Sequence, residues 1–470
     1  MYSSYLKSRH DIAKELLNRL LKRYDYVSIL GKHVTGKTIT VTSHNTSIGD
    51  TMEKQCGFVV QILTKTHCSE YSFSDLNEKN IDEIEQNIIK KTELAPGLEK
   101  ETVSLAQMKD EPLKRDFYRP VEDGINDTYP LDKALERLKK IKDAIQGYSD
   151  KIIMVQTMLT YWDTSAMFLS KNRDLTQDYT WINVNAVPVA REGSNIKYAY
   201  NVGAFNSFDK SFKFIEERTS SMAQLAIDLL HSEHIKPGVY DIVTDPSITG
   251  LIAHEAFGHG VEMDMFVKNR AKSVHYLNKR VASDLIEMHD GAKATLSSAS
   301  YFFDDDGVLA HDTLIIKDGI LQRGISDAVS ALQLGTEPTG NSRRESYKRK
   351  AYTRMTNTFF VPRHDKLEDM IKSVKYGYYL VNTDNGMEDP KNWNIQCVCQ
   401  YGREIKDGKF TGKIVAPVVM SGYVPDLLES VSMVSDEASV IGSGHCGKGY
   451  KEWVTVSDGG PALKARCKLG

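Results

Sequence analysis

Apolar residues that recur every three or four positions predict amphipathic helices in the first half of the chain. Near the start, Ile12, Leu16 and Leu20 mark one apolar face. A second helix is expected over residues 75–94, a third in LDKALERLKKIKDAIQGY, and another near residues 215–234. Each helix has one apolar face, so each is expected to pack against its own domain.

Runs of β-branched residues with partial alternation predict strands between these helices. The clearest are YDYVSIL, TITVTSHNTSIGD, GFVVQILTKTHCSEYSF, IIMVQTMLTYWDTSAMFLS and YTWINVNAVPVAREG. The stretch up to about residue 130 contains four prolines and is expected to be a long connection or an extended arm. From residue 298 onward strands again outnumber helices. The pattern predicts an α+β fold with antiparallel or mixed sheets in two domains, 1–235 and 236–470. The second domain is mainly β, with one helix at its start.

Charge and cysteine content narrow the classes of function. The 470 residues include 60 Lys and Arg against 63 Asp and Glu, which argues against a polybasic nucleic-acid or membrane binder. No apolar run is long enough to span a membrane, and the first residues lack the features of a signal peptide. Six cysteines are too few for a disulfide framework. We therefore expect a cytoplasmic protein with free thiols, bound neither to nucleic acid nor to a membrane.

Two segments resemble the phosphate-binding loop of nucleotide-binding proteins. Residues 31–38 match its consensus in every required letter, but Ile39-Thr40-Val41-Thr42 follows as a strand pattern where a true loop opens a helix. A hairpin turn is therefore the better prediction, with a nucleotide-binding protein as the weaker alternative. Residues 442–449 nearly match, but the segment ends in Gly449, where Mg²⁺ binding requires a hydroxyl.

The segment LIAHEAFGHG carries the most informative chemistry. His254 and His259 are potential metal ligands, and Glu255 directly follows the first of them, as the general base does in zinc hydrolases. Histidines four apart lie about 40° apart around an α-helix, but these are five apart, or about 140°. The spacing therefore predicts a π-type bulge, or a helix that loosens at Gly258. If neither forms, one histidine is simply buried and the other exposed.

A catalytic zinc site needs a third protein ligand. Cys446 is the best candidate because it lies in a glycine-dense loop where a thiolate can point inward. Glu262, Asp264 and His445 are the alternatives, and Glu262 and Asp264 are also candidates for outer hydrogen-bond partners of the histidines.

Several blocks in the second half resemble the TldD/PmbA family of zinc metallopeptidases, some of whose members are labelled DNA gyrase modulators. They are GVYDIVTDPSITGLIAHEAFGHGVEMDMF, FDDDGVLAHDTLIIKDGIL, TGNSRRESY, RMTNTFF and SVSMVSDEASVIGSGHCGKGY. The resemblance implies the metal-bearing, TldD-like branch. It also implies Zn²⁺ held by His254, His259 and Cys446, with Glu255 as catalytic base. The segment NTDNGMEDPKNWNIQCVCQYGREI departs from the pattern of the relatives.

The resulting hypothesis is a zinc-dependent peptidase that hydrolyses short or unfolded peptides with a metal-activated water and Glu255 as general base. The resemblance implies a homodimer or a heterodimer with a PmbA-like subunit. Arg343 and Arg344 are candidate ligands for the backbone or a carboxylate of the peptide, with structural ion pairs as an equal alternative. The competing hypothesis for the whole chain is a non-catalytic partner subunit, with a structural metal or none.

Overall fold

The computed structural model describes residues 2–64, 67–93, 110–123, 129–440, 442, 444–449 and 452–470. The helices are α1 Ser4–Leu20, α2 Ile81–Glu93, α3 Leu131–Gln146, α4 Phe208–Glu216, α5 Thr219–Leu229, α6 Pro246–Leu251, α7 Met263–Val267, α8 Ala328–Gln333, α9 Leu367–Lys372 and α10 Val424–Glu429. A π-helix Ile252–Gly258 follows α6, and 3₁₀ turns occupy His259–Val261 and Lys272–Tyr276.

The strands fall into a first group, before residue 206, and a second group, from residue 238 onward. The first group is β1 Tyr26–Thr42, β2 Thr46–Asp50, β3 Gln55–Leu63, β4 Cys68–Phe73, β5 Leu113–Arg119, β6 Ile152–Ser170, β7 Arg173–Glu192, β8 Asn195–Tyr198 and β9 Asn201–Phe205. The second is β10 Gly238–Thr244, β11 Met288–Asp290, β12 Thr313–Lys317, β13 Ile320–Leu321, β14 Ser342–Arg343, β15 Tyr352–Thr353, β16 Asn357–Phe360, β17 Tyr376–Asp389, β18 Asn394–Lys406, β19 Lys409–Val415, β20 Val418–Tyr423, β21 Met433–Val440, β22 Gly444–Cys446 and β23 Val454–Leu469.

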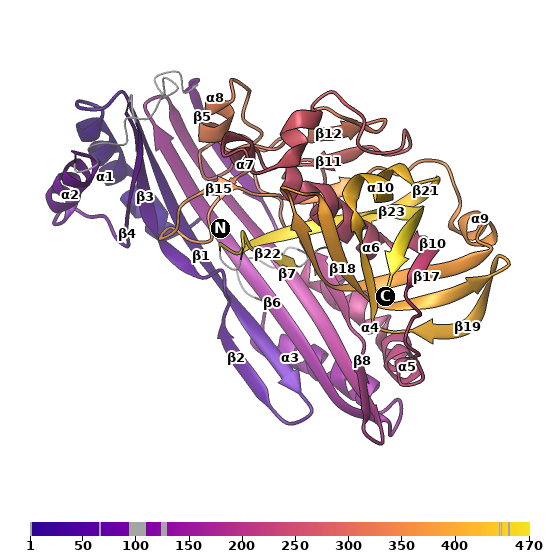
Figure 1. The fold of residues 1–470 in the computed structure, drawn as a ribbon. Helices are drawn as coiled ribbons and strands as arrows, with labels where there is room; N and C mark the ends of the chain where they lie inside the picture. The colour runs from indigo at the N-terminus through magenta and orange to yellow at the C-terminus, as the bar shows by residue number, and fades with distance from the viewer. Residues whose placement is uncertain are drawn as a thin grey trace.

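The first group forms one nine-stranded sheet in the order β4-β3-β1-β6-β7-β5, with β2, β8 and β9 attached at its sides. All neighbours along this path are antiparallel except β5 and β7, which are parallel. Figure 1 shows β1, β6 and β7 as long strands that cross the molecule, with α1 and α2 near one end and α3 near the other.

The two faces of β1 explain how the halves of the molecule are layered, because successive side chains of a strand point to opposite faces. Val27 packs in the core formed with α1 and α2, and Ile39 packs in the core formed with α3, α4 and α5. Leu30 instead packs with Phe303 of the second half, and the Lys32 ammonium lies 2.6 Å from the Asp305 carboxylate. The helices therefore cover one face of the sheet, and the second half of the chain covers the other.

The second group forms a twelve-stranded mixed sheet, and β23 is its central element. β23 pairs with β10, β16, β20, β21 and β22, so it connects segments that are far apart in the sequence. A two-stranded ribbon of β14 and β15 lies outside this sheet.

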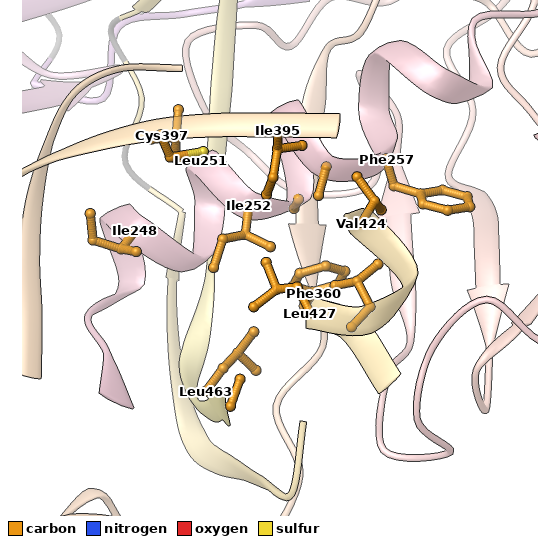
Figure 2. Close-up of a cluster of buried hydrophobic side chains, with 14 of the residues drawn as sticks. Ile248, Leu251, Ile252, Phe257, Phe360, Ile395, Cys397, Val424, Leu427 and Leu463 are labelled. Atoms are coloured by element: carbon orange, nitrogen blue, oxygen red, sulfur yellow. The ribbon is translucent and has the colours of Figure 1, made fainter. Parts of the chain in front are cut away.

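The core of the second half surrounds α6 and the π-helix. Figure 2 shows Ile248, Ile252 and Phe257 along this helical segment, with Ile252 pointing toward Phe360 and Leu427. All five side chains are buried in the same hydrophobic cluster. Dense packing on this side fixes the position of the helical segment, because its apolar residues leave little room for movement.

The structure confirms the α+β class with antiparallel and mixed sheets, and strands cover the regions where alternation predicted them. The helix expected near residues 215–234 is in fact two helices: α4 starts earlier, at Phe208, and α5 runs from Thr219 to Leu229. The proline-rich stretch contains β5, although residues 94–109 and 124–128 lie outside the described part. The division into domains 1–235 and 236–470 stays a prediction.

The predicted hairpin turn at residues 31–38 is wrong, because β1 runs through the whole segment without interruption. The two glycines serve sheet packing instead. A Cβ at Gly31 would lie 2.9 Å from Phe58, and one at Gly36 would lie 2.0 Å from the carbonyl oxygen of Tyr161 on β6. Glycine is therefore needed here for close approach between neighbouring strands and side chains, which sequence letters alone do not reveal.

Candidate metal centre

The helical segment that carries the histidines begins at a well-defined cap. Asp245 directly follows β10, and its carboxylate accepts a hydrogen bond of 2.8 Å from the Ile248 N–H. Pro246 occupies the first helical position, where a missing N–H costs nothing. This cap starts α6 beside the sheet and directs the following turns into the core of the second half.

The π-helix solves the spacing problem posed by the two histidines. The N–H of His259 donates to the carbonyl oxygen of His254, five residues earlier, which is the hydrogen bond that defines a π-helix. One turn therefore separates the rings, whose centroids lie 5.2 Å apart at an interplanar angle of 89°. The predicted π-type bulge is confirmed, and both side chains face the same place.

Close packing explains the glycine in this turn. A Cβ on Gly258 would lie 2.1 Å from the Met355 sulfur, closer than any side-chain contact allows. The bulged helix can therefore press against the segment before β16 only because residue 258 has no side chain.

Cys446 completes a group of three potential ligands. It ends β22, which pairs with β23 so that Cys446 faces Val454, and its side chain is buried. Its sulfur lies 3.3 Å from His259 Nε2. One ligand atom from each of His254, His259 and Cys446 lies within 4.8 Å of the others, and no other such group occurs among the described residues.

The electrostatics of the three groups are mutually dependent. Burial works to raise the pKa of the Cys446 thiol, but the two imidazoles outweigh it and hold that pKa well below its usual value. Burial likewise works to lower the pKa of His254, and the Cys446 thiolate overcomes it and raises that pKa to about 9. The pKa of His259 is also raised well above its usual value, against burial and chiefly by the same thiolate. The site therefore stabilises a thiolate, which is the form that binds metals.

A second layer of charges surrounds His259. The Glu262 carboxylate lies 3.6 Å from His259 Nδ1, and Lys448 approaches Glu262 at 3.0 Å and Asp264 at 2.7 Å. Arg354 Nε lies 3.3 Å from Glu262, and its Nη2 donates to the Cys446 carbonyl oxygen at 2.7 Å. Glu262 is thus placed as an outer partner of the candidate ligand His259, whereas Asp264 contacts Lys448 and Lys268 rather than a histidine. Such partners orient ligating imidazoles.

Glu255 lies on the same π-helix, with one carboxylate oxygen 4.0 Å from His259 Nε2. Its side chain is 11% exposed and packs over β17, where a Cβ on Gly386 would lie 2.5 Å from its Cγ. Two further acids near the site escaped the sequence reasoning. Burial raises the pKa of Asp458 to about 6, and both carboxylate oxygens of Glu388 are buried with no hydrogen-bond partner in the described residues.

The chemistry of the donor set fits zinc. Two imidazoles and a thiolate are ligands that Zn²⁺ prefers, and three protein ligands are the number usual in catalytic zinc sites. The ligand atoms are close enough together for one ion to contact all three. The depressed pKa of the Cys446 thiol also means that a proton is easily removed from this ligand before metal binding.

The remaining predicted site residues lie elsewhere. His445 points away from the group of three and contacts Glu53 at 2.8 Å. Arg344 is buried and lies 3.1 Å from Glu70 and 3.7 Å from Asp305, so its charge is neutralised between the two halves. Peptide binding by either Arg343 or Arg344 stays a prediction.

The geometry of residues 31–38 gives the nucleotide hypothesis no support. Lys37 extends from β1 to the neighbouring strand, where its ammonium lies 2.8 Å from Asp50 in an exposed ion pair. A phosphate-binding loop requires backbone N–H groups at the start of a helix, and here those groups belong to a strand.

Comparison with known proteins finds similarity to metallopeptidases. Residues 237–466 match the model of the PmbA/TldA metallopeptidase C-terminal domain. The zinc metalloprotease TldD homolog of Saccharolobus solfataricus is 25% identical over 453 residues, which cover 94% of this chain and 95% of the relative. The metalloprotease TldD homolog of Buchnera aphidicola from Acyrthosiphon pisum is 32% identical over 279 residues, covering 58% of this chain and 56% of the relative.

Residues 237–466 therefore carry the C-terminal domain of the PmbA/TldD family. The chain also resembles the crystal structure of TldE from Thermococcus kodakarensis, with a TM-score of 0.78 over 97% of this chain and 99% of that one. Sequence identity to TldE is 18%, so this likeness shows a shared fold. Among the described residues, no helix is both long and apolar enough to cross a bilayer.

Proposed function

We propose that this protein is a zinc-dependent peptidase of the TldD/PmbA family that hydrolyses short or unfolded peptides. His254, His259 and Cys446 hold the ion in this proposal, and Glu255 is the general base. The observation that carries it is the π-helix, which turns an unfavourable histidine spacing into a pair of rings facing a buried thiol. The names of the relatives, which are metalloproteases, support the same class of activity.

His254, His259 and Cys446 would hold a zinc ion, which would act as a Lewis acid on the scissile carbonyl and would lower the pKa of water. Glu255 accepts the proton of the attacking water at its carboxylate and then returns it to the leaving amine. Its place directly after His254 and its contact with His259 support this role. Glu262, held by Lys448 and Arg354, keeps the His259 ring oriented.

We further propose that the protein acts as a dimer, with a copy of itself or with a PmbA-like subunit. The likeness to TldE supports a fold suited to such pairing, because two chains of one fold can bury corresponding surfaces. The competing hypothesis, a non-catalytic partner subunit, requires neither a base beside the ligands nor a complete ligand set. The presence of both favours the enzyme.

The deciding experiment is Glu255→Gln, which keeps the size of the side chain but removes the base. Turnover of an unfolded peptide is expected to fall by roughly 10²–10⁴, the usual contribution of general acid–base catalysis. Zinc content and thermal stability are expected to remain at the wild-type level, because Glu255 is not among the three ligands. Both proteins are assayed with and without a PmbA-like subunit and analysed for metal.

Three results lead to different conclusions. A variant that cleaves at the wild-type rate contradicts the role of Glu255. A variant that loses its zinc shows that Glu255 is a ligand. Wild-type protein that binds zinc but cleaves no peptide under any of these conditions supports the partner-subunit hypothesis.

A further inference from the structure

We propose that a cavity beside β22, the strand that carries Cys446, binds the C-terminal carboxylate of a peptide through Arg343. The cavity measures about 140 Å³ and lies between the first sheet and the second half of the chain. Lys32, Trp162 and Tyr179 line it from the first sheet, and Arg343, His445 and Trp453 line it from the second half. The inference deepens the proposed function, on which the choice of a peptide as ligand rests.

The charges around the cavity single out Arg343. Lys32 is paired with Asp305 at 2.6 Å, Arg344 with Glu70 at 3.1 Å, and His445 with Glu53 at 2.8 Å. Glu345 also lines the cavity and lies 3.8 Å from Arg349. In the described part of the chain, no carboxylate oxygen lies within ion-pair distance of Arg343.

The Arg343 guanidinium is nevertheless held in place. Its Nη1 donates to the Met355 carbonyl oxygen at 2.7 Å, and its central carbon lies 5.7 Å from the centre of the Tyr301 ring. That hydrogen bond uses one N–H group and leaves others for a ligand. A fixed, planar guanidinium without a carboxylate partner suits two parallel hydrogen bonds to a carboxylate.

The walls of the cavity suit the rest of a peptide's last residue. Aromatic rings of Trp162, Tyr179, Tyr301 and Trp453 line it, and Trp453 is 44% exposed. Aromatic rings give a small apolar side chain a large contact area. The combination of one unpaired cation and several rings favours an apolar residue with a free carboxylate over a purely ionic ligand.

The position of the cavity connects it with the metal centre. His445 and Cys446 are successive residues of β22, so their side chains point to opposite faces of the strand. Cys446 faces His259, whereas His445 faces Glu53 and the cavity. A carboxylate held by Arg343 therefore lies across one strand from the proposed zinc ligands, and the site would select peptides by a free C-terminus.

The test compares N-acetyl-leucine with N-acetyl-leucinamide, which lacks the negative charge. Two of the four tryptophans line the cavity and a third packs against Trp162, so intrinsic fluorescence reports binding, with calorimetry as a second readout. The acid is expected to bind at least about tenfold more tightly than the amide, the effect of one charge-assisted contact. Arg343→Gln is expected to abolish that preference. The matched control is Arg403→Gln, which changes an exposed arginine of β18 that stacks on Phe410. This variant is expected to keep the preference for the acid over the amide.

Two further measurements separate this site from the metal centre. Protein treated with a chelator is expected to keep the preference, because Arg343 is not a proposed zinc ligand. Trp453→Ala is expected to weaken binding of the acid and of the amide equally, because Arg343 stays in place. This variant still tests the cavity if Arg343→Gln does not fold. N-acetyl-aspartic acid α-amide, whose only carboxylate is on the side chain, shows whether a side-chain carboxylate suffices.

The outcomes are distinct. Equal binding of acid and amide, absence of binding of either, or a preference unchanged in Arg343→Gln overturns the proposal. A preference that disappears with the chelator places the carboxylate on the metal and overturns it as well. Tight binding of N-acetyl-aspartic acid α-amide overturns the assignment to a C-terminus. None of these results depends on peptide cleavage, so failure of the peptidase assay is separately recognisable.

Discussion

Two segments that match or nearly match the phosphate-loop consensus, residues 31–38 and 442–449, have very different surroundings in this protein. Residues 31–38 form the interior of β1, and Lys37 makes an ion pair on the surface. The described residues of 442–449 form β22 and the turn after it, while Ser443 lies outside the described part. Here Cys446 joins two histidines, and Lys448 is 17% exposed between Glu262 and Asp264.

The difference shows that the surroundings of a lysine, rather than the letters around it, decide its importance. Lys37 faces solvent across a strand pair, where attraction to Asp50 is screened and costs side-chain entropy. Lys448 is enclosed with two carboxylates, where its loss leaves the buried negative charge only partly compensated by Arg354 and Lys268. Substitutions in the two segments are therefore expected to have effects of very different size.

The largest effect is expected from Cys446→Ser. A hydroxyl is a poor zinc ligand compared with a thiolate, so the variant is expected to lose most of its zinc and, with it, peptidase turnover. Metal analysis of protein purified without chelator gives the answer directly. Full zinc occupancy in the variant would remove Cys446 from the proposed ligand set. Cys56→Ser, a cysteine of β3 that is not among the proposed ligands, is the matched control.

Lys448→Met is expected to have the next largest effect. The methionine keeps the length of the side chain but leaves Glu262 and Asp264 without the ammonium. Removing one partner of a buried ion pair costs about 3 kcal/mol, because the remaining charge stays in a poorly solvated place. Urea unfolding at pH 7 measures the loss, and a variant as stable as wild type would mean that Arg354 alone compensates the two acids.

The cost of Lys448→Met is expected to shrink in acid. Burial favours a raised pKa of Glu262, but Lys448, with help from His259 and Arg354, holds that pKa well below its usual value. A carboxylate with a depressed pKa in the folded protein contributes stability above its unfolded pKa, about 4.3, and loses it as the pH falls further. The stability difference between wild type and variant is thus expected to be greatest above pH 5 and to narrow towards pH 3. A difference that grows in acid would show that another group dominates.

Lys37→Ala is expected to have the smallest effect. The free energy of unfolding is expected to change by less than about 0.5 kcal/mol, as for other exposed ion pairs, and zinc content and turnover are expected to stay the same. ATP binding measured by calorimetry serves as the check. ATP binding that is present in wild type and absent from the variant would support the nucleotide hypothesis. It would also show that Lys37, like Lys448, has a specific role.

Periodicity in the sequence predicted those parts of the fold that depend on local pattern. The apolar faces of α1 and α3 follow from residues such as Leu16 and Leu138, because a helix repeats every 3.6 residues. The continuous β1 was not predicted, because Gly31 and Gly36 look like turn residues until their partners on β3 and β6 are known.

The sequence likewise predicted only part of the candidate site. Binding of one metal ion by both His254 and His259 required a distorted helix, and the structure contains one. Cys446 was only the best of several candidates until the family resemblance was considered. The sequence did not predict the roles of Lys448 and Arg354, because these roles arise from long-range packing around Glu262. Local sequence patterns do not predict ion pairs between residues that are almost a hundred or more positions apart.

The distance along the chain between the proposed ligands affects when the site can form. Cys446 follows His259 by 187 residues, and its strand is held by β23, which also pairs with β10 beside the helical segment. During synthesis the histidines leave the ribosome long before the thiol and its supporting strand exist. Under the proposed function, a partly made chain has two zinc ligands but no third, so peptide cleavage is withheld until the second half has been translated and its sheet has closed around the site.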